Sequence, residues 1–95
     1  MDFDWDESKR LVNRRKHGID FVAATAAFAD PRRIETVEFF RGEERWRLIG
    51  LAPEGVLYIV YVERGEVIRI ISARKATRGE ARTYYEGEGG RRPSL

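Results

Sequence analysis

VLYIVYVERGEVIRIISARKATR, residues 56–78, is the stretch that decides the fold. It holds two apolar runs rich in Val, Ile and Tyr, the side chains that fit a pleated surface. Between the runs, Glu63 and Arg64 precede Gly65, and a glycine at positive φ closes a tight hairpin without strain. Because neither run alternates cleanly between apolar and polar residues, we expect both strands to be central in a sheet and covered on two faces.

One cation interrupts the second apolar run. Arg69 lies between Ile68 and Ile70, and in a strand its side chain points away from theirs. A guanidinium on a mostly apolar face must be paired or lie in a cleft. The strand then leads into a helix through a basic cluster that contains Arg74, Lys75 and Arg78. The most apolar segment of the chain therefore ends in a row of cations.

The amino-terminal segment predicts a strand and a helix. Residues 3–5 alternate between apolar and polar side chains, which indicates a short strand. A helix is predicted over residues 7–16, and either Asp4 or Asp6 can cap its first turn. Its last turn is basic, which suits the helix dipole, and Gly18 is a natural residue to end it.

The rest of the chain predicts a second helix, a sheet and a last helix. The second helix begins after Asp20 and ends at Pro31. Strands are expected over residues 34–40, 45–52, 56–62 and 66–73, and their short connectors favour antiparallel pairing as a meander. Thr77 and Glu80 form a capping box for a helix over residues 78–86. The expected fold is α+β: an antiparallel meander sheet with two N-terminal helices on one face and one C-terminal helix.

Composition limits the classes of function. A chain of 95 residues is one domain, expected over residues 1–86, with a disordered Gly-rich tail over residues 87–95. Cys is absent, His occurs once, and no carboxylates cluster at the spacing of metal ligands, so we expect no metal and no cofactor. The sequence has no signal peptide and no apolar run that can span a bilayer, which predicts a cytoplasmic protein.

The cations favour oxyanion partners. Formal net charge is +2 and the isoelectric point is about 9.2, and only three of the 18 cationic side chains are Lys. Arg binds planar oxyanions through a bidentate fork and stacks on bases, so this bias favours phosphate or carboxylate ligands. A solvated surface of mixed charge explains the same composition.

Few side chains here can transfer a proton near neutral pH. His17 is the one whose unperturbed pKa lies in that range, and it can act as a general acid or base. The alternative is a histidine at a helix end with no catalytic role. Glu63 is either a base or the partner of Arg64. Tyr84 and Tyr85 either stack on bases or pack within the fold.

The basic side chains can bind phosphate and stabilise a pentacoordinate anion. The arginines among them cannot act as a base, because Arg stays protonated at neutral pH. The candidates are Arg64, Arg69, Arg74, Lys75 and Arg78. Ion pairs with Glu63, Glu66 and Glu80 on a solvated surface are the alternative. The residues alone thus indicate a small α+β domain with a cationic ridge that can bind nucleic acid.

A set of strings in this sequence resembles one protein family. The strings are Phe3-Asp4-Trp5-Asp6 with Lys9 and Asn13, Lys16-His17-Gly18-Ile19-Asp20-Phe21, Ala24, Phe28, Asp30-Pro31, Glu44-Arg45, Ile49-Gly50, Tyr61-Val62-Glu63-Arg64-Gly65, and Ile68-Arg69-Ile70-Ile71-Ser72-Ala73-Arg74-Lys75-Ala76-Thr77-Arg78 with Glu80 and Tyr85. Together they resemble the BrnT toxins of bacterial type II toxin–antitoxin systems, over nearly the whole chain to about Glu86.

This resemblance implies a RelE-like fold, ribonuclease toxicity and neutralisation by a BrnA-type antitoxin. The antitoxin would carry a ribbon-helix-helix part, and the complex would bind operator DNA only through it. The candidate catalytic residues are His17, Glu63, Arg64, Arg69, Arg74 and Lys75, and the candidate RNA-binding residues are Lys9, Arg78 and Tyr85. A non-catalytic corepressor subunit of a DNA-binding antitoxin complex is the alternative function.

The lack of metal-ligand spacing favours a metal-independent cleavage of RNA. Such a reaction uses the 2′-OH of the substrate as the nucleophile and is therefore restricted to RNA. His17 or Glu63 would accept the 2′-OH proton, with Lys75 as a weaker choice. Arg64, Arg69 and Arg74 would stabilise the phosphorane.

Overall fold

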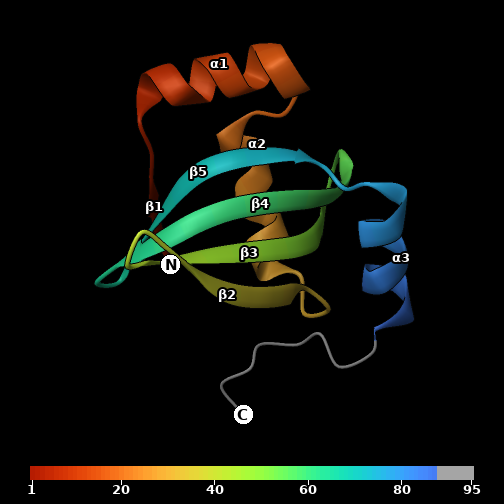
Figure 1. Cartoon of the computed structure of the whole chain (residues 1–95). Coiled ribbons are helices and arrows are strands. Elements are labelled where there is room, and N and C mark those ends of the chain that lie inside the picture. Colours follow the sequence, from red (N-terminus) through yellow and green to blue (C-terminus); the bar gives the residue numbers. More distant parts are fainter. Residues whose placement is uncertain (88–95) are drawn as a thin grey trace.

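The structure is a computed structural model that describes residues 1–87. One five-stranded sheet organises this part of the chain. The elements in chain order are β1 (Asp2–Asp4), α1 (Glu7–His17), α2 (Phe21–Ala24), the 3₁₀ helix η1 (Thr25–Ala29), β2 (Ile34–Phe40), β3 (Glu43–Ala52), β4 (Gly55–Arg64), β5 (Val67–Lys75) and α3 (Arg78–Glu86). The strand order is β1-β5-β4-β3-β2 (Figure 1). Apart from Gly87, the tail predicted to be disordered lies outside the described residues.

The sheet is mixed, so the predicted antiparallel meander is wrong at one strand. β2 to β5 pair antiparallel through short turns, as predicted, but β1 pairs with β5 in parallel, with Phe3 opposite Ile68. A short turn forces antiparallel pairing, whereas β1 is separated from β5 by two helices and three strands, which leaves either direction open. The ring of Phe3 packs edge-on against Phe28 at 5.0 Å and ties β1 to the core.

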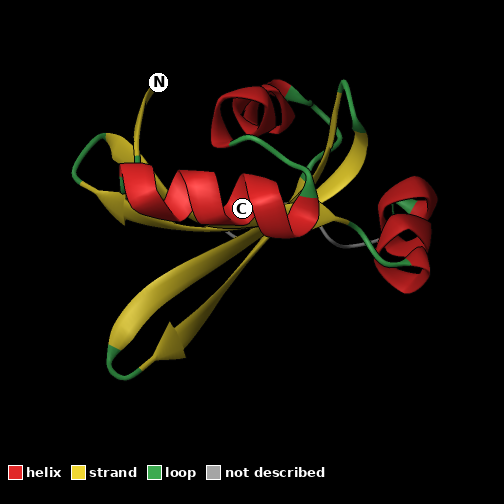
Figure 2. Cartoon of the chain, turned by 90° about the horizontal axis from the view of Figure 1, so that it is seen from above, coloured by secondary structure: helices red, strands yellow, loops and turns green. Residues whose placement is uncertain are grey.

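The helices also differ from the predicted layout. Only α2 and η1 pack on a face of the sheet, whereas α1 lies along the edge at β5 and α3 lies near the strand ends (Figure 1). Seen from above, α1 runs across the view with α2 to one side of it and α3 at one end (Figure 2). The two strong apolar residues of α1, Leu11 and Val12, are exposed, so this helix has no apolar stripe to lay on a sheet face.

The side chain of Asn13 holds α1 to the edge of β5. Its Nδ2 donates hydrogen bonds to the carbonyl oxygens of Ala73, at 2.7 Å, and Ile19, at 3.0 Å. Its Oδ1 accepts a hydrogen bond from the backbone N–H of Ala73 at 3.1 Å. β1 covers the edge of β5 only to Arg69, so the amide of Asn13 replaces a neighbouring strand at a point that β1 does not reach.

The core lies between the sheet and the α2–η1 segment. Alternate residues of β3, β4 and β5 face it, and Leu48, Ile59 and Ala73 are fully buried there. η1 approaches β3 so closely that a Cβ at Gly50 would lie 2.9 Å from the backbone oxygen of Ala27. This position of the sheet therefore requires glycine.

A bulge changes which side chains of β5 face outward. Val60 pairs with Ser72 and Tyr61 pairs with Ile70, so Ile71 is an extra residue. Past the bulge, Ala73 faces the core and Arg74 points to the opposite face, which we call the outer face. The prediction that β4 and β5 are covered on two faces is only partly right, because the outer face is half-exposed at several positions.

Helix ends follow the sequence signals closely. Asp6 caps α1 by accepting from the N–H groups of Ser8 and Lys9, and Gly18 ends it with φ of 74°. Asp20 caps α2, and Thr77 and Glu80 form the predicted capping box of α3. Within residues 1–87, no helix is both long and apolar enough to cross a bilayer.

We expect Gly50→Ala to lower the free energy of unfolding by roughly 1–3 kcal/mol, because the new methyl group would force η1 away from β3. Gly79→Ala is the matched control, since a Cβ there meets nothing within 4 Å and Ala favours the helix. Thermal melting of both variants tests this close approach. Equal melting temperatures would contradict it.

We expect Asn13→Ala to lower the free energy of unfolding by roughly 2–4 kcal/mol, because the N–H and C=O of Ala73 and the C=O of Ile19 lose their partner. Arg15→Ala on the same helix is exposed and should change it by less than about 0.5 kcal/mol. Urea denaturation measures both. A loss no larger than that of Arg15→Ala would show that α1 is held by other contacts.

Candidate functional site

Polar side chains gather on the outer face of the sheet, opposite α2. Strand pairing places Tyr58 between Ile49 and Arg74 in one row across β3, β4 and β5. The next row contains Arg47, Val60 and Ser72. We call Arg47, Tyr58 and Arg74 the outer-face cluster.

Arg74 is held over the ring of Tyr58. Its Cζ lies 4.1 Å from the ring centroid, a cation–π contact. Its Nη1 and Nη2 donate to the two carboxylate oxygens of Glu80 at 2.9 and 3.0 Å. Glu80 Oε1 also accepts from the backbone N–H of Thr77 at 2.8 Å, so the capping box of α3 fixes the carboxylate that orients Arg74.

The electrostatics of the outer-face cluster follow from this geometry. The hydrogen bonds with Glu80 raise the pKa of Arg74, and those with Arg74 lower the pKa of Glu80. Burial raises the pKa of the Tyr58 hydroxyl, an effect that the charge of Arg47 opposes. Tyr58 therefore stays protonated at neutral pH and can donate a hydrogen bond.

Other outer-face arginines are paired with acids. Arg69 Nη1 lies 3.2 Å from Asp4 Oδ1, because β1 places Asp4 directly beside it. Arg47 forms an ion pair with Glu38 of β2. The prediction that Arg69 is paired or in a cleft is confirmed by the contact with Asp4.

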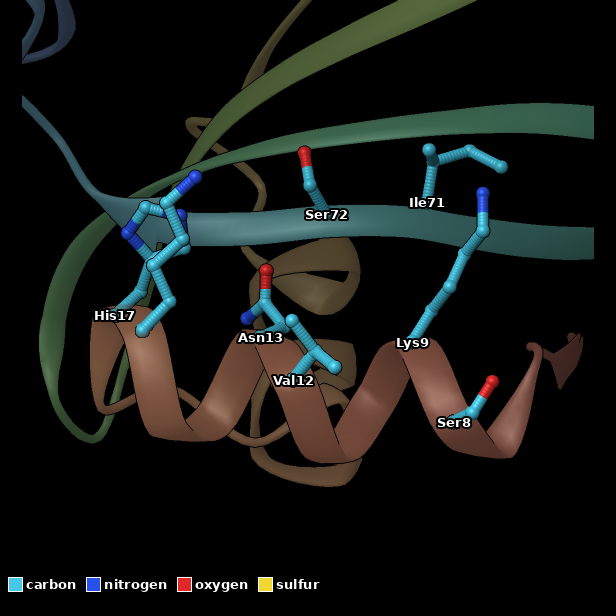
Figure 3. Close-up of a pocket in the computed structure, with 8 residues that line it drawn as sticks. Ser8, Lys9, Val12, Asn13, His17, Ile71 and Ser72 are labelled. Carbon is cyan, nitrogen blue, oxygen red and sulfur yellow. The ribbon is translucent and has the colours of Figure 1, made fainter.

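A groove runs between α1 and β5 on the edge of the sheet. Its volume is about 290 Å³, and its lining residues are Ser8, Lys9, Val12, Asn13, Lys16, His17, Ile71 and Ser72. Lys9 lies toward one end and His17 toward the other, with Asn13 and Ser72 between them (Figure 3). The structure thus brings the candidates Lys9 and His17 together on one helix face. The groove and the outer-face cluster meet at β5, since Ser72 belongs to the groove and to the row of Arg47.

Glu63 and Arg64 lie elsewhere, at the hairpin tips. They line a hollow of about 400 Å³ together with Gly42, Glu43, Glu44 and Val62. Arg64 lies 3.7 Å from Glu43, and the three glutamates make the hollow acidic. Arg64 pairs with Val67, and the seven residues from there to Arg74 span roughly 20 Å of strand. The structure therefore does not bring these two candidates to the outer-face cluster.

The remaining candidates lie around the end of β5 and on α3. Lys75 is exposed at the last position of β5, and its carbonyl accepts from Arg74 Nη1 at 3.1 Å. Arg78 is exposed at the first position of α3. Tyr85 is 62% exposed and contacts the buried Tyr84 edge-on at 5.1 Å. Tyr84 donates to Asp30, so it is a packing residue and Tyr85 is the tyrosine available to a ligand.

Sequence reasoning missed two members of the outer-face cluster, Tyr58 and Arg47. Tyr58 lies within an apolar run that predicts only a strand, and its pairing with Arg74 depends on the bulge. Counted back from the hairpin turn at Gly65, a regular register would pair Tyr58 with Ala73, so the sequence carries no signal for this contact. No group of three or more His, Asp or Glu side chains positioned to hold a metal ion occurs in residues 1–87.

The fold and this site define a class: a small α+β protein with an open sheet face that carries arginines and a tyrosine. Residues 5–80 match the family model described as the ribonuclease toxin BrnT of type II toxin–antitoxin systems. The match covers most of the chain, and the protein belongs to the BrnT family. A comparison with the curated proteins gives no match.

The ion pair of Arg74 and Glu80 predicts a pH-dependent contribution to stability. The folded pKa of Glu80 is lowered from 4.5, so its contribution is present above that pH and is lost as pH falls through the folded pKa. We expect Glu80→Gln to be less stable than wild type at pH 7 and the difference to shrink as the pH falls below 4.5 and through the lowered pKa of Glu80. Denaturation at a series of pH values measures this. Glu86→Gln, on the same helix and exposed, should retain the wild-type profile, and a constant difference for Glu80→Gln would contradict the assignment.

Proposed function

We propose that this BrnT-family protein is a metal-independent endoribonuclease that cleaves RNA on its outer face. The observation that carries the proposal is the outer-face cluster, in which Arg47 and Arg74 flank Tyr58 on a half-exposed sheet face. Two guanidinium groups beside a neutral hydroxyl can bind a phosphodiester and stabilise the charge that develops on it. The family's ribonuclease toxicity supports the same conclusion.

The reaction needs no group beyond the RNA and the side chains. The 2′-oxygen of the substrate attacks the adjacent phosphorus, and the bond from phosphorus to the 5′-oxygen breaks. A base accepts the 2′-OH proton, and an acid gives a proton to the leaving 5′-oxygen. The products are a 2′,3′-cyclic phosphate and a 5′-OH end. Arg74 and Arg47 stabilise the phosphorane, and Arg69, five residues before Arg74 on β5, contacts a neighbouring phosphate.

Among the candidate bases, His17 has the most support. The groove that it lines meets the outer-face cluster at Ser72, whereas Glu63 lies at the far end of the hairpin. Lys75 is exposed at the end of β5 and is the weaker choice. We propose Tyr58 as the acid, because burial raises its pKa and keeps the proton on its oxygen.

The other candidates would bind flanking parts of the RNA. Arg78 and Tyr85 are exposed on α3, next to the helix cap that holds Glu80. Lys9 lies in the groove on the opposite side of the site. Arg64, at the end of β4 opposite Val67, is too far from Arg74 to reach the phosphorane, so we propose that it contacts only longer RNA, in spite of the acids around it.

The partner that silences this activity is an antitoxin, as the family's type II system implies. We propose a BrnA-type protein with a ribbon-helix-helix part, so that the complex binds operator DNA only through the antitoxin. Both proteins would act in the cytoplasm, where RNA is available.

One observation favours a second function, a non-catalytic corepressor subunit. The arginines of the outer face are ion-paired within the chain, Arg47 with Glu38, Arg69 with Asp4 and Arg74 with Glu80, which weakens their attraction for RNA. Expression of the protein without an antitoxin separates the two functions. A ribonuclease arrests growth and removes transcripts, and a corepressor does neither.

We expect the purified protein to cleave RNA in the presence of EDTA, to leave 2′,3′-cyclic phosphate and 5′-OH ends, and not to cleave DNA. Arg74→Ala should reduce the cleavage rate by about 10²–10³-fold, the typical effect of losing one donor to the transition state. Arg82→Ala, exposed on α3, is the matched control and should cleave at the wild-type rate. Gel analysis of end-labelled RNA measures both.

Strict dependence on magnesium or 5′-phosphate products would rule out this mechanism. Undiminished cleavage by His17→Ala would remove only that residue and transfer the base to Lys75, since Glu63 lies away from the outer-face cluster. Tyr58→Phe keeps the ring beneath Arg74 and removes the hydroxyl, so unchanged cleavage by this variant would exclude Tyr58 as the acid.

A further inference from the structure

Apart from His17, the side chains that line the groove between α1 and β5 have no part in the proposed cleavage step. We infer that it is a second RNA subsite, which binds backbone phosphates of single-stranded RNA beside the nucleotide at the outer-face cluster. The inference rests on the proposed function for the identity of the ligand. It rests on the groove itself for the geometry.

Cations stand at both ends of the groove. Lys9 and Lys16 are seven residues apart on α1, which is two turns and roughly 10 Å along one helix face. His17 follows Lys16 in the chain and adds an imidazole at the end of the groove away from Lys9. No carboxylate lines the groove. An anionic chain laid along α1 would therefore meet a positive charge at each end and repulsion at neither.

The middle of the groove suits a sugar or a base. Val12, which is 54% exposed, and Ile71, the bulged residue of β5, supply apolar contact. Ser72 adds a hydroxyl that can donate or accept a hydrogen bond. This alternation of charge, apolar surface and charge matches the repeat of phosphate, sugar and phosphate along RNA.

The groove is also continuous with the proposed site of cleavage. Ser72 lines it and at the same time belongs to the row of Val60 and Arg47 on the outer face. Ser72 and Arg74 are two residues apart on β5, or roughly 7 Å. One RNA strand can therefore pass from the outer-face cluster to α1 without leaving the surface.

The same observations favour RNA over an acidic peptide. A peptide that bound as an added strand would need the open edge of β5, and both backbone groups of Ala73 there are already bonded to Asn13. The groove also leads directly into the outer-face cluster rather than to an isolated apolar patch. Docking of an acidic segment of the antitoxin is the competing occupant that the experiment must separate.

The test uses the purified protein and a short single-stranded RNA of mixed sequence that is 2′-O-methylated, so that it cannot be cleaved. Fluorescence anisotropy measures its affinity over a series of salt concentrations. We expect the double variant Lys9→Ala/Lys16→Ala to bind roughly tenfold more weakly and to reduce the slope of log affinity against log salt by about 1.4, the value for two lost phosphate contacts. Lys9→Arg/Lys16→Arg should restore both.

Arg15→Ala is the matched control, because it removes a cation from α1 outside the groove lining. It should reduce the affinity and the slope less than either single lysine variant. All these positions are exposed, so thermal melting should be unchanged. Unchanged RNA binding by the double variant overturns the inference. If that variant instead binds the antitoxin more weakly, the groove is a protein-docking surface.

The outcome is independent of catalysis. A protein that binds the uncleavable RNA through Lys9 and Lys16 but cleaves no RNA refutes the ribonuclease proposal and leaves the subsite standing. A protein that cleaves RNA while its double variant binds the probe at wild-type strength refutes only the subsite.

Discussion

The arrangement of α1 depends on the side-chain amide of Asn13. α1 buries almost no apolar surface of its own, since Leu11 and Val12 are exposed, and burial is what usually fixes a helix on a sheet. In place of apolar burial, Asn13 makes three hydrogen bonds, two with Ala73 and one with Ile19, and its side chain is buried from water. Buried polar groups that have only one set of partners fix the geometry around them, because any other placement leaves the groups unpaired. Together with the ion pair of Arg10 and Asp20 at 2.7 Å, this contact fixes the wall that α1 gives to the groove.

The bulge at Ile71 has a comparable role on the outer face. Arg69 and Arg74 are an odd number of residues apart, so regular alternation would place them on opposite faces of β5. The extra residue restores Ala73 to the core and brings Arg74 to the face of Arg69, next to Tyr58. A regular strand would have buried the guanidinium of Arg74 among apolar side chains at high cost. The bulge is thus the local irregularity that builds a cationic face on an apolar strand.

Features set by neighbouring residues could be predicted from the sequence, and features set by distant ones could not. The caps at Asp20 and Thr77 and the glycine turn at Gly65 each depend on a few adjacent residues, and the sequence predicts each of them. The single second helix predicted before Pro31 is only partly right, because it divides into α2 and the 3₁₀ helix η1. The parallel pairing of β1 depends on residues 65 positions away, and the edge position of α1 depends on the partner of Asn13, 60 positions away. Likewise the cations of the site could be named from the sequence, but Tyr58 could not, because its relation to Arg74 depends on strand register and a bulge.

The ion pair of Arg74 and Glu80 links the candidate site to α3. Glu80 holds Arg74 through two hydrogen bonds and holds the N-cap of α3 through a third, so one carboxylate serves both. A phosphate offers Arg74 the same planar, bidentate acceptor as the carboxylate does. In the proposed ribonuclease, a phosphodiester that took that place would leave Glu80 bonded to Thr77, so the helix would retain its cap while the guanidinium changed partner. Opening the ion pair would therefore exchange one oxyanion for another on the half-exposed side chain of Arg74. Arg74 would stay over Tyr58, because the ring contacts the face of the guanidinium and leaves its N–H donors free for the phosphate. An arginine that is paired in the free protein is in this way kept oriented for a ligand rather than withdrawn from it.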